Sequence, residues 1–460
     1  MSESEQKLPA NLASAFKAYD IRGRLPDELN EYAAYRIGLA YGELFGPGKV
    51  AVGRDIRLSG PTMVAALTRG LLESGCDVMD LGMVGTEEVY HAVAHQKLKG
   101  GIAVTASHNP ADYNGMKLVR EDARPISADT GLKELLDFVQ SGKEPTVERK
   151  PGKRIELDGK AAYIDDLLAY VKAVDLRPYR IVANCGNGSV GPALETLREH
   201  LPFEFTVLQG EPDGEFPNGV PNPLLMENRQ LTADALAEAA ADFAIAWDGD
   251  FDRCFFWDEN GRFIEGYYVI GLLAQRLLRD HPGAKVVHDP RLYWNTVDVV
   301  SRAGGKPVMS KSGHAFIKER MRIEGAIYGG EMSAHHYFQS FSYCDSGMVP
   351  MLLVAALMSE TGEPLSALVD DMIERYPCSG EINRTVDDPD ALLKRIEDEY
   401  AGGANRVDYT DGLSIDHADW RFNIRKSNTE PLVRINVEAR GDRSLLETKT
   451  KELLRRIEAS

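Results

Sequence analysis

The sequence has little that is typical of an exported, membrane-embedded or nucleic-acid-binding protein. It contains no apolar run of the ~18 residues that suggest a membrane helix, and no signal-peptide pattern at its N-terminus. Its five cysteines show no paired or zinc-like spacing, as is typical of reduced thiols. The net charge of −18 argues against a nucleic-acid or anionic-membrane partner. We therefore predict a cytoplasmic protein without nucleic-acid or membrane partners.

A chain of 460 residues is too long for a single core, so several domains are expected. Helix and strand patterns alternate along the first part of the chain, which predicts an α/β fold with a mostly parallel sheet. A polar segment with Pro and Gly at about 141–158 has the composition of a linker. After Pro377 the pattern changes to helices mixed with antiparallel-looking strands.

The segment Thr105–Pro110 follows a short apolar strand, 100–104, and contains Thr, Ser, His and Asn before a turn. Ligands bind at the carboxyl edge of open α/β sheets. The hydroxyl of Ser107 is therefore expected to be exposed, as a nucleophile or phosphate carrier. Lys117, on the hairpin that follows, and Arg22, before a Gly turn, are candidate phosphate ligands. Composition alone also allows a plain polar loop with solvated charges.

Three carboxylates, Asp248, Asp250 and Asp252, follow the apolar strand 244–247 at alternate positions. Without a cation such a group would repel itself, so the spacing predicts a metal site, and Mg²⁺ suits it. A calcium-binding EF-hand is the main alternative. It is disfavoured because Arg253 occupies the position that needs Gly, and a strand pattern follows.

Two later loops carry further polar side chains. Glu331, Ser333 and His335 alternate after Gly329-Gly330, and such acceptors and donors suit a polyol. Metal binding by His335 and His336 is an alternative, although adjacent histidines point apart in an extended chain. The segment Arg425–Pro431, between two predicted strands, has the composition of a phosphate cradle or of an ordinary hairpin connection.

Gly186, Gly188 and Gly191 formally match the dinucleotide fingerprint after a strand. A proline follows at once and no acidic residue ends the next strand, so a glycine turn is the preferred interpretation. With no P-loop or kinase glycine loop either, the phosphoryl donor is predicted to be the protein itself. The four loops together indicate phosphoryl transfer to or from a sugar phosphate.

These four loops, in this order, resemble those of the α-D-phosphohexomutase superfamily, most closely its bacterial phosphomannomutase branch. The resemblance covers essentially the whole chain. It implies a four-domain α/β architecture, with three similar α/β domains and a C-terminal α+β domain around a central cleft. The expected domains are residues 1–150 with the phosphoserine loop, 151–258 with the metal loop, 259–368 with the sugar loop and 369–460 with the phosphate loop.

The resemblance also implies a mechanism. Phosphorylated Ser107 donates to a hexose phosphate, and the resulting hexose 1,6-bisphosphate, which also serves as activator, returns its other phosphate to the serine. Mg²⁺ is bound by Ser107, Asp248, Asp250 and Asp252. The implied catalytic residues are Ser107, Arg22, His108, Lys117, Arg253 and His335. The implied substrate ligands are Tyr19, His314, Glu331, Ser333, Arg425, Ser427, Asn428 and Thr429.

The expected reaction interconverts mannose 6-phosphate and mannose 1-phosphate, with glucose phosphates as possible further substrates. In the sugar loop Ala334 stands where the commoner family form has Gly, which mildly favours mannose. Phosphoglucomutase and phosphoglucosamine mutase are the nearest alternatives. A Mg²⁺-dependent sugar-phosphate phosphatase and a sugar-phosphate-binding protein without turnover are more distant ones. The absence of heptads or obvious edge motifs favours a monomer.

Overall fold

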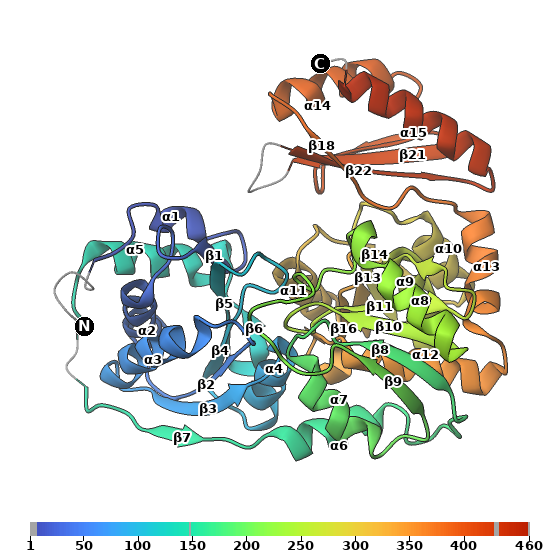
Figure 1. Cartoon of the computed structure of the whole chain (residues 1–460). Coiled ribbons are helices and arrows are strands. Elements are labelled where there is room, and N and C mark those ends of the chain that lie inside the picture. Colours follow the sequence, from blue (N-terminus) through green and yellow to red (C-terminus); the bar gives the residue numbers. More distant parts are fainter. Residues whose placement is uncertain (1–6, 147–148, 427–431, 459–460) are drawn as a thin grey trace. The chain divides into compact units, whose positions relative to one another are not determined.

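The computed structural model describes residues 7–146, 149–426 and 432–458 (Figure 1). Internal contacts divide the chain into two units. Unit 1 contains residues 1–263 and 340–360, and unit 2 contains residues 264–339 and 361–460. Each unit is described by itself below.

The first sheet of unit 1 has seven strands in the order β1-β5-β4-β2-β3-β7, with β6 beside β5. Strands β4, β2, β3 and β7 are parallel, whereas β5 is antiparallel to β1, β4 and β6. The strands are β1 Ile21–Arg24, β2 Lys49–Arg54, β3 Asp77–Met83, β4 Gly100–Val104, β5 Tyr113–Arg120, β6 Arg124–Pro125 and β7 Arg154–Glu156. The helices are α1 Leu12–Ala15, α2 Glu31–Phe45, α3 Gly60–Glu73, α4 Thr86–His95 and α5 Lys133–Ser141.

Helices α2 and α3 pack so closely that glycine is required at their crossing. A Cβ atom at Gly38 would lie 2.3 Å from the carbonyl oxygen of Leu67, and one at Gly70 would lie 2.1 Å from that of Tyr35. Strand β7 lies inside the segment expected to be a linker, and it pairs with β3 at the edge of the sheet. Its three residues are all exposed, so no apolar alternation marked them as a strand.

The second sheet of unit 1 has five strands in the order β12-β11-β10-β8-β9. Its central strand β10 is buried along its whole length, which explains its continuous apolar run. The strands are β8 Arg180–Asn184, β9 Glu204–Leu208, β10 Phe243–Trp247, β11 Cys254–Asp258 and β12 Phe263–Ile264. The other elements of unit 1 are α6 Lys160–Ala169, α7 Val190–Arg198, α8 Gln230–Ala239, β17 Cys344–Asp345 and α12 Met348–Thr361, whose last residue belongs to unit 2.

Unit 2 contains a mixed sheet with the strand order β14-β13-β15-β16 and an antiparallel sheet with the order β18-β22-β21-β20-β19. The first sheet is built from β13 Lys285–His288, β14 Lys306–Met309, β15 Tyr328–Gly330 and β16 His336–Phe338, with α9 Gly266–Asp280, α10 Trp294–Arg302, α11 His314–Glu324 and α13 Leu365–Arg375. The second is built from β18 Ile382–Thr385, β19 Arg406–Asp408, β20 Leu413–Asp416, β21 Trp420–Lys426 and β22 Leu432–Ala439. Helices α14 Pro389–Tyr400 and α15 Arg443–Glu458 cover one face of this second sheet (Figure 1).

Within the described residues, no single helix has the length and apolar composition to cross a membrane. Helices α12 and α13 pass that test only as a bent pair. Residues 348–358 of α12 are all buried within the protein, as in the core helix of a folded domain.

Glu87 joins three segments of unit 1 that are distant in sequence. Its carboxylate accepts hydrogen bonds from the Tyr163 hydroxyl on α6 at 2.6 Å, the Ser346 hydroxyl at 2.8 Å and the Gly347 amide at 2.5 Å. The last two residues lead into α12. Burial raises the pKa of Glu87 to about 8, although these three donors favour the charged form.

This burial makes Glu87 a source of pH-dependent stability. The folded protein keeps the proton on Glu87 up to about pH 8, whereas an unfolded chain releases it near pH ~4.3. Because the unfolded chain then binds fewer protons, stability falls as pH rises through this range, by up to about 1.4 kcal/mol per pH unit.

Glu87→Gln, which cannot ionise, should remove that slope. Thermal unfolding midpoints from pH 5 to pH 8 measure it, with the exposed Glu134→Gln as control. Parallel pH profiles for wild type and Glu87→Gln would contradict the prediction.

Candidate functional site

Ser107 lies at the carboxyl end of β4 and is buried, with 1 % of its surface exposed. This corrects the expectation of an exposed hydroxyl, which ignored the chain segments that fold over the loop. The Ser107 hydroxyl donates a hydrogen bond to Asp248 Oδ2 at 2.6 Å and lies 3.0 Å from His108 Nδ1. Its φ of +49° is in the left-handed region, which is costly for a residue with a side chain and typical of functional turns.

The guanidinium group of Arg57 holds the loop after β4 in position by hydrogen bonds. Its two terminal nitrogens donate to four backbone carbonyls of the loop, those of Ser107, Asn109, Pro110 and Tyr113, at 2.6–2.9 Å. Asp55 supports both partners, because its carboxylate lies 3.3 Å from Arg57 Nε and accepts from the Thr105 hydroxyl at 2.7 Å. The backbone position of Ser107 therefore depends on one buried guanidinium.

Arg57→Lys should lower activity strongly while leaving the Ser107 hydroxyl in the chain. A single ammonium cannot replace two forked nitrogens that bind four carbonyls, so the loop loses its fixed position. Misplacement of a reacting group by about 1 Å costs on the order of 10²-fold in rate. We expect a fall of that size in kcat, measured against Arg69→Lys, whose side chain is 43 % exposed on α3. Unchanged kcat in Arg57→Lys would show that the hydrogen bonds from Arg57 to the loop are not needed for activity.

The acidic loop follows β10 and brings its three carboxylates together. Asp248, Asp250 and Asp252 are all fully buried, and one oxygen of each lies within 4.8 Å of the others. Gly249 lies against the Ser107 loop, because a Cβ there would be 2.7 Å from the Ser107 carbonyl oxygen. The structure thus brings the three acidic residues together, with Ser107 beside them.

Three side chains hold the acidic loop. Lys117 Nζ lies 2.7 Å from Asp250 Oδ2 and also binds Asp252. The Thr86 hydroxyl at the start of α4 donates to Asp250 Oδ2 at 2.6 Å, and Arg253 Nε lies 3.4 Å from Asp248 Oδ2. Two cations thus face three carboxylates in a buried space.

The carboxylates differ in their proton affinities. Burial raises the pKa of Asp248 to about 6 even though Arg253 opposes the shift. Burial would also raise the pKa of Asp250, but the Lys117 ammonium and the Thr86 hydroxyl outweigh it and lower that pKa. For Lys117, burial favours the neutral amine, yet Asp250 and Asp252 raise its pKa, so the ammonium is kept charged.

The acidic loop fits a hard divalent cation. Asp248 Oδ1 and Asp250 Oδ1 are buried and have no hydrogen-bond partner within the described part of the chain. Buried carboxylate oxygens without a partner are costly unless a cation binds them. Oxygen ligands with an excess of negative charge are those that Mg²⁺ prefers.

Two further predicted residues of unit 1, Arg22 and Arg253, contact the Ser107 loop. Arg22, on β1, donates to Asp20 Oδ2 at 2.7 Å and to Asn109 Oδ1 at 3.0 Å. Arg253 Nη2 lies 2.8 Å from His108 Nδ1, and since an arginine can only donate, this imidazole nitrogen is the acceptor. Partial burial and the charge of Arg253 lower the pKa of His108. Tyr19 lies in the bend before β1 and is half-buried.

In unit 2, the loop from Glu331 to His335 is a tight turn between β15 and β16 and not an extended segment. The Glu331 amide donates to the His335 carbonyl at 2.9 Å, and Ala334 has a φ of +68°. Both Glu331 carboxylate oxygens have partners: Oε1 accepts from the Gly313 amide at 2.8 Å and Oε2 from the Tyr337 hydroxyl at 2.5 Å. Sequence alternation could not reveal this turn.

Arg291 connects the members of this loop. Its Nη2 donates to Asp289 Oδ2 at 2.7 Å, to Glu331 Oε1 at 3.2 Å and to Ser333 Oγ at 3.2 Å. Glu331 and Ser333 are thus brought together by an arginine that the sequence pattern did not identify. His335 stacks instead on Tyr337, with ring centroids 5.9 Å apart.

The side chains of His335 and His336 are not arranged to bind one metal ion together. The buried His336 ring packs on Tyr328, and burial lowers its pKa to about 3. The two rings thus contact different tyrosines. His314 begins α11 and is buried.

Arg425 lies within β21, which extends to Lys426, and not in the connection after it. It faces Arg434 across the β21–β22 ladder, and both guanidinium groups approach Glu381, at 3.3 Å and 3.5 Å. Burial would raise the pKa of Glu381, but Arg425, Arg434 and Arg291 outweigh it and lower it. Ser427, Asn428 and Thr429, the rest of the predicted cradle, lie outside the described residues.

Four family models match the chain in sequence order. They are the phosphoglucomutase/phosphomannomutase alpha/beta/alpha domains I, II and III, at residues 13–145, 161–261 and 265–376, and the C-terminal domain of the same family, at residues 381–455. The chain belongs to the phosphoglucomutase/phosphomannomutase family. The superfamily and the fold class of three α/β domains with a different C-terminal domain, both predicted from the sequence, are confirmed.

Individual relatives agree over nearly the full length. A Xanthomonas campestris protein named phosphohexose mutases is 58% identical over 439 residues, which are 95% of this chain and 98% of that protein. A Salmonella montevideo phosphomannomutase is 56% identical, covering 96% of this chain and 99% of its own. The crystal structure of a family member from Burkholderia thailandensis superposes with a TM-score of 0.86 at 32% identity, covering 97% of each chain.

Several residues of this phosphohexomutase site have no local sequence signal. Thr86 reaches the acidic loop from 164 positions away and Arg57 reaches Ser107 from 50. Arg291 directly follows Asp289-Pro290 at the end of β13, and a charged pair at the carboxyl end of a strand was the signal that could have identified it. Arg434 is one of the alternating residues of β22 and looks like an ordinary exposed strand position.

Proposed function

We propose that this chain is a phosphomannomutase that interconverts mannose 6-phosphate and mannose 1-phosphate through phosphorylated Ser107 and a hexose 1,6-bisphosphate. The observation that carries the proposal is the hydrogen bond of 2.6 Å between the Ser107 hydroxyl and Asp248, within a cluster of three buried carboxylates. Near-full-length relatives named phosphomannomutase support the choice of substrate.

The proposed phosphoryl transfer is a nucleophilic displacement at phosphorus. The bond between phosphorus and Ser107 Oγ breaks as a sugar hydroxyl oxygen binds the phosphorus. The hydroxyl proton passes to a protein group, and Ser107 Oγ leaves with the bonding electrons and takes up a proton to become a hydroxyl. The reverse displacement at the other phosphate regenerates phosphoserine. We assign Lys117 and Arg253 to the charge on the transferring group, and Arg22 and His108 to contact with it or with its proton.

Mg²⁺ is proposed to bind Asp248, Asp250, Asp252 and a phosphoserine oxygen, where it would neutralise phosphoryl charge and align the group for displacement. The protein's part is to hold the three carboxylates in fixed positions. Thr86 and Gly249 do this, the first by its hydrogen bond to Asp250 and the second by allowing close contact with the Ser107 loop.

Unit 2 is proposed to hold the sugar and the phosphate that is not transferred. Glu331 and Ser333, aligned by Arg291, would bind sugar hydroxyls, with His314 as a further substrate contact. His335 is proposed, like Arg22 and His108, to handle a proton or contact the phosphoryl group. Arg425 would bind phosphate by exchanging part of its contact with Glu381, together with Ser427, Asn428 and Thr429. Forked guanidinium donors suit phosphate geometry.

We further propose the domain limits 1–150, 151–258, 259–368 and 369–460, a monomeric state, and a cytoplasmic location. The location is supported by the five cysteines, none of which forms a disulfide within the described residues. Activity on glucose phosphates is a further proposal.

The deciding assay measures mutase turnover with Mg²⁺ and trace hexose 1,6-bisphosphate, comparing mannose 1-phosphate with glucose 1-phosphate. We expect efficient turnover of mannose 1-phosphate. Comparable rates on both would make it a dual-specificity enzyme. Inorganic phosphate released at the rate of substrate loss would indicate a phosphatase, and bisphosphate that leaves Ser107 unphosphorylated would indicate a binding protein.

A further inference from the structure

A second cluster of potential metal ligands lies in unit 1, away from the residues assigned to the mutase reaction. His91 and His95 stand one turn apart on α4, and Asp166 faces them from α6. His91 is buried, whereas the side chains of His95 and Asp166 are 42% and 53% exposed. Within the described part of unit 1, none of the three forms a hydrogen bond or ion pair with the Ser107 loop or the acidic loop.

The distances between the three donor atoms suit a small metal ion. Asp166 Oδ2 lies 2.8 Å from His91 Nε2 and 3.4 Å from His95 Nδ1. All three atoms lie within 4.8 Å of one another. In a tetrahedral zinc site with ligand bonds of about 2.0–2.1 Å, neighbouring donors are about 3.3 Å apart. Small rotations of the two half-exposed side chains would meet that geometry.

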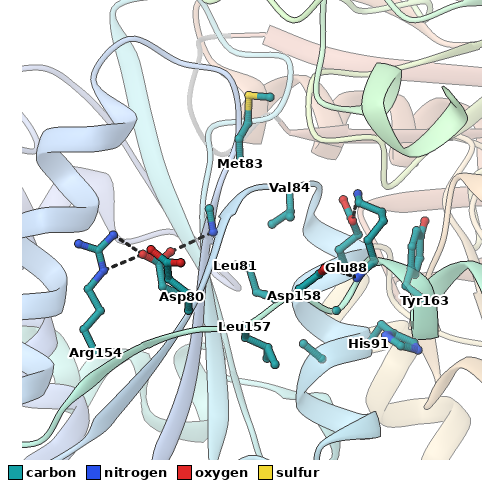
Figure 2. Close-up of a pocket in the computed structure, with 15 residues that line it drawn as sticks. Asp80, Leu81, Met83, Val84, Glu88, His91, Arg154, Leu157, Asp158 and Tyr163 are labelled. Atoms are coloured by element: carbon teal, nitrogen blue, oxygen red, sulfur yellow. Dashed lines mark hydrogen bonds and ion pairs between the residues drawn. The ribbon is translucent and has the colours of Figure 1, made fainter. Parts of the chain in front are cut away.

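The surroundings hold the His91 ring in place. It stacks on Phe341 at 6.1 Å and meets the edge of Tyr163 at 5.5 Å, and Figure 2 shows His91 beside Tyr163. The ring also stacks on His95 at 5.0 Å, so both imidazoles are turned to the same side of α4. His91 also borders a cavity of about 450 Å³ that Asp80, Glu88 and Lys160 help to line.

We propose that His91, His95 and Asp166 form a binding site for a divalent transition-metal ion of the zinc type. Two imidazoles and one carboxylate are a donor set that favours Zn²⁺ over Mg²⁺, because Mg²⁺ prefers oxygen ligands throughout. Three protein ligands leave the fourth tetrahedral position to water. The acidic loop, with its three carboxylates, has the opposite preference, so the two sites select different ions.

A bound ion would fasten α4 to α6. Both helices also meet through Glu87 and Tyr163, and α4 begins at Thr86, which binds Asp250. The metal would therefore act as a crosslink near the C-terminal end of a helix whose first residue supports the acidic loop. Its expected effect is on stability, because it binds the folded arrangement of two helices and not the unfolded chain.

The test titrates Zn²⁺ by calorimetry into the full chain in excess Mg²⁺, which occupies the acidic loop. The wild type should bind one equivalent of Zn²⁺ at this site, and its thermal unfolding midpoint should rise. His95→Gln and Asp166→Asn should each weaken this binding at least tenfold. Both side chains are half-exposed, so both variants should fold and keep the Mg²⁺-dependent activity of the wild type. His281→Gln, an exposed histidine on unit 2, is the matched control.

Titration with Co²⁺ distinguishes the possible ligands. Absorption bands of a tetrahedral nitrogen and oxygen site, lost in His95→Gln, would support the proposal. A cobalt–thiolate band would instead identify a cysteine site. Zn²⁺ binding that is unchanged in His95→Gln and Asp166→Asn, or absent when Mg²⁺ is in excess, would overturn it. The result is independent of the mutase assay, since neither variant touches the residues assigned to catalysis.

Discussion

Replacing Ser107 by alanine should reduce mutase turnover by at least about 10⁴-fold, because the variant has no oxygen to carry the phosphoryl group. Binding and charge neutralisation by the other residues would remain. The loss should appear in kcat, measured with mannose 1-phosphate and trace bisphosphate. Incubation with labelled hexose 1,6-bisphosphate should also leave the variant unlabelled, whereas the wild type acquires one phosphate per chain.

The same substitution should cost a little stability. Ser107 is buried and its hydroxyl donates to Asp248, so its removal should cost about 1 kcal/mol. Ser74→Ala is the matched control, because Ser74 is equally buried and donates to the Leu71 carbonyl at 2.8 Å. It should lose a similar amount of stability and keep its turnover. Near-normal activity in Ser107→Ala would remove this serine from the mechanism.

The sequence was sufficient to predict the parts of this site that lie directly after apolar strands. Strands β4 and β10 are buried along their whole length, so their residue patterns were clear, and the polar residues after them fell at the sheet edge. The order of the four loops then indicated the family. Such signals are local, because a strand and the loop that follows it are adjacent in the chain.

The residues that hold the site in position could not be predicted from local sequence patterns. Arg57 and Thr86 act on loops far along the chain, and only the folded sheet brings them there. The Ser107 loop is in close contact with Gly249 from a different sheet, and the turn at Ala334 depends on a left-handed backbone that alanine seldom adopts. Long-range packing determines these features, and a single sequence contains no direct record of it.

Removing Mg²⁺ should abolish turnover, and Lys117 should influence the affinity with which Mg²⁺ binds again. In the structure the Lys117 ammonium binds Asp250 and Asp252, two of the three proposed ligands. Mg²⁺ must either displace this ammonium group or bind close to its positive charge. Both requirements weaken the binding of Mg²⁺. Treatment with a chelator should therefore inactivate the enzyme, and Mg²⁺ should restore it at a concentration set partly by Lys117.

Lys117→Met tests this with effects of opposite sign. Without the competing charge, Mg²⁺ should bind at least tenfold more tightly. In chelator, the variant should be less stable than wild type by about 3 kcal/mol, because three buried carboxylates lose their main counter-charge, and Mg²⁺ should reverse that loss. At saturating Mg²⁺, kcat should still fall at least 100-fold, because Lys117 no longer stabilises the transferring group. Calorimetry, thermal unfolding and kinetics measure the three effects, with the exposed Lys133→Met as control. A variant that needs more Mg²⁺ than wild type would mean that the ion binds elsewhere than at these carboxylates.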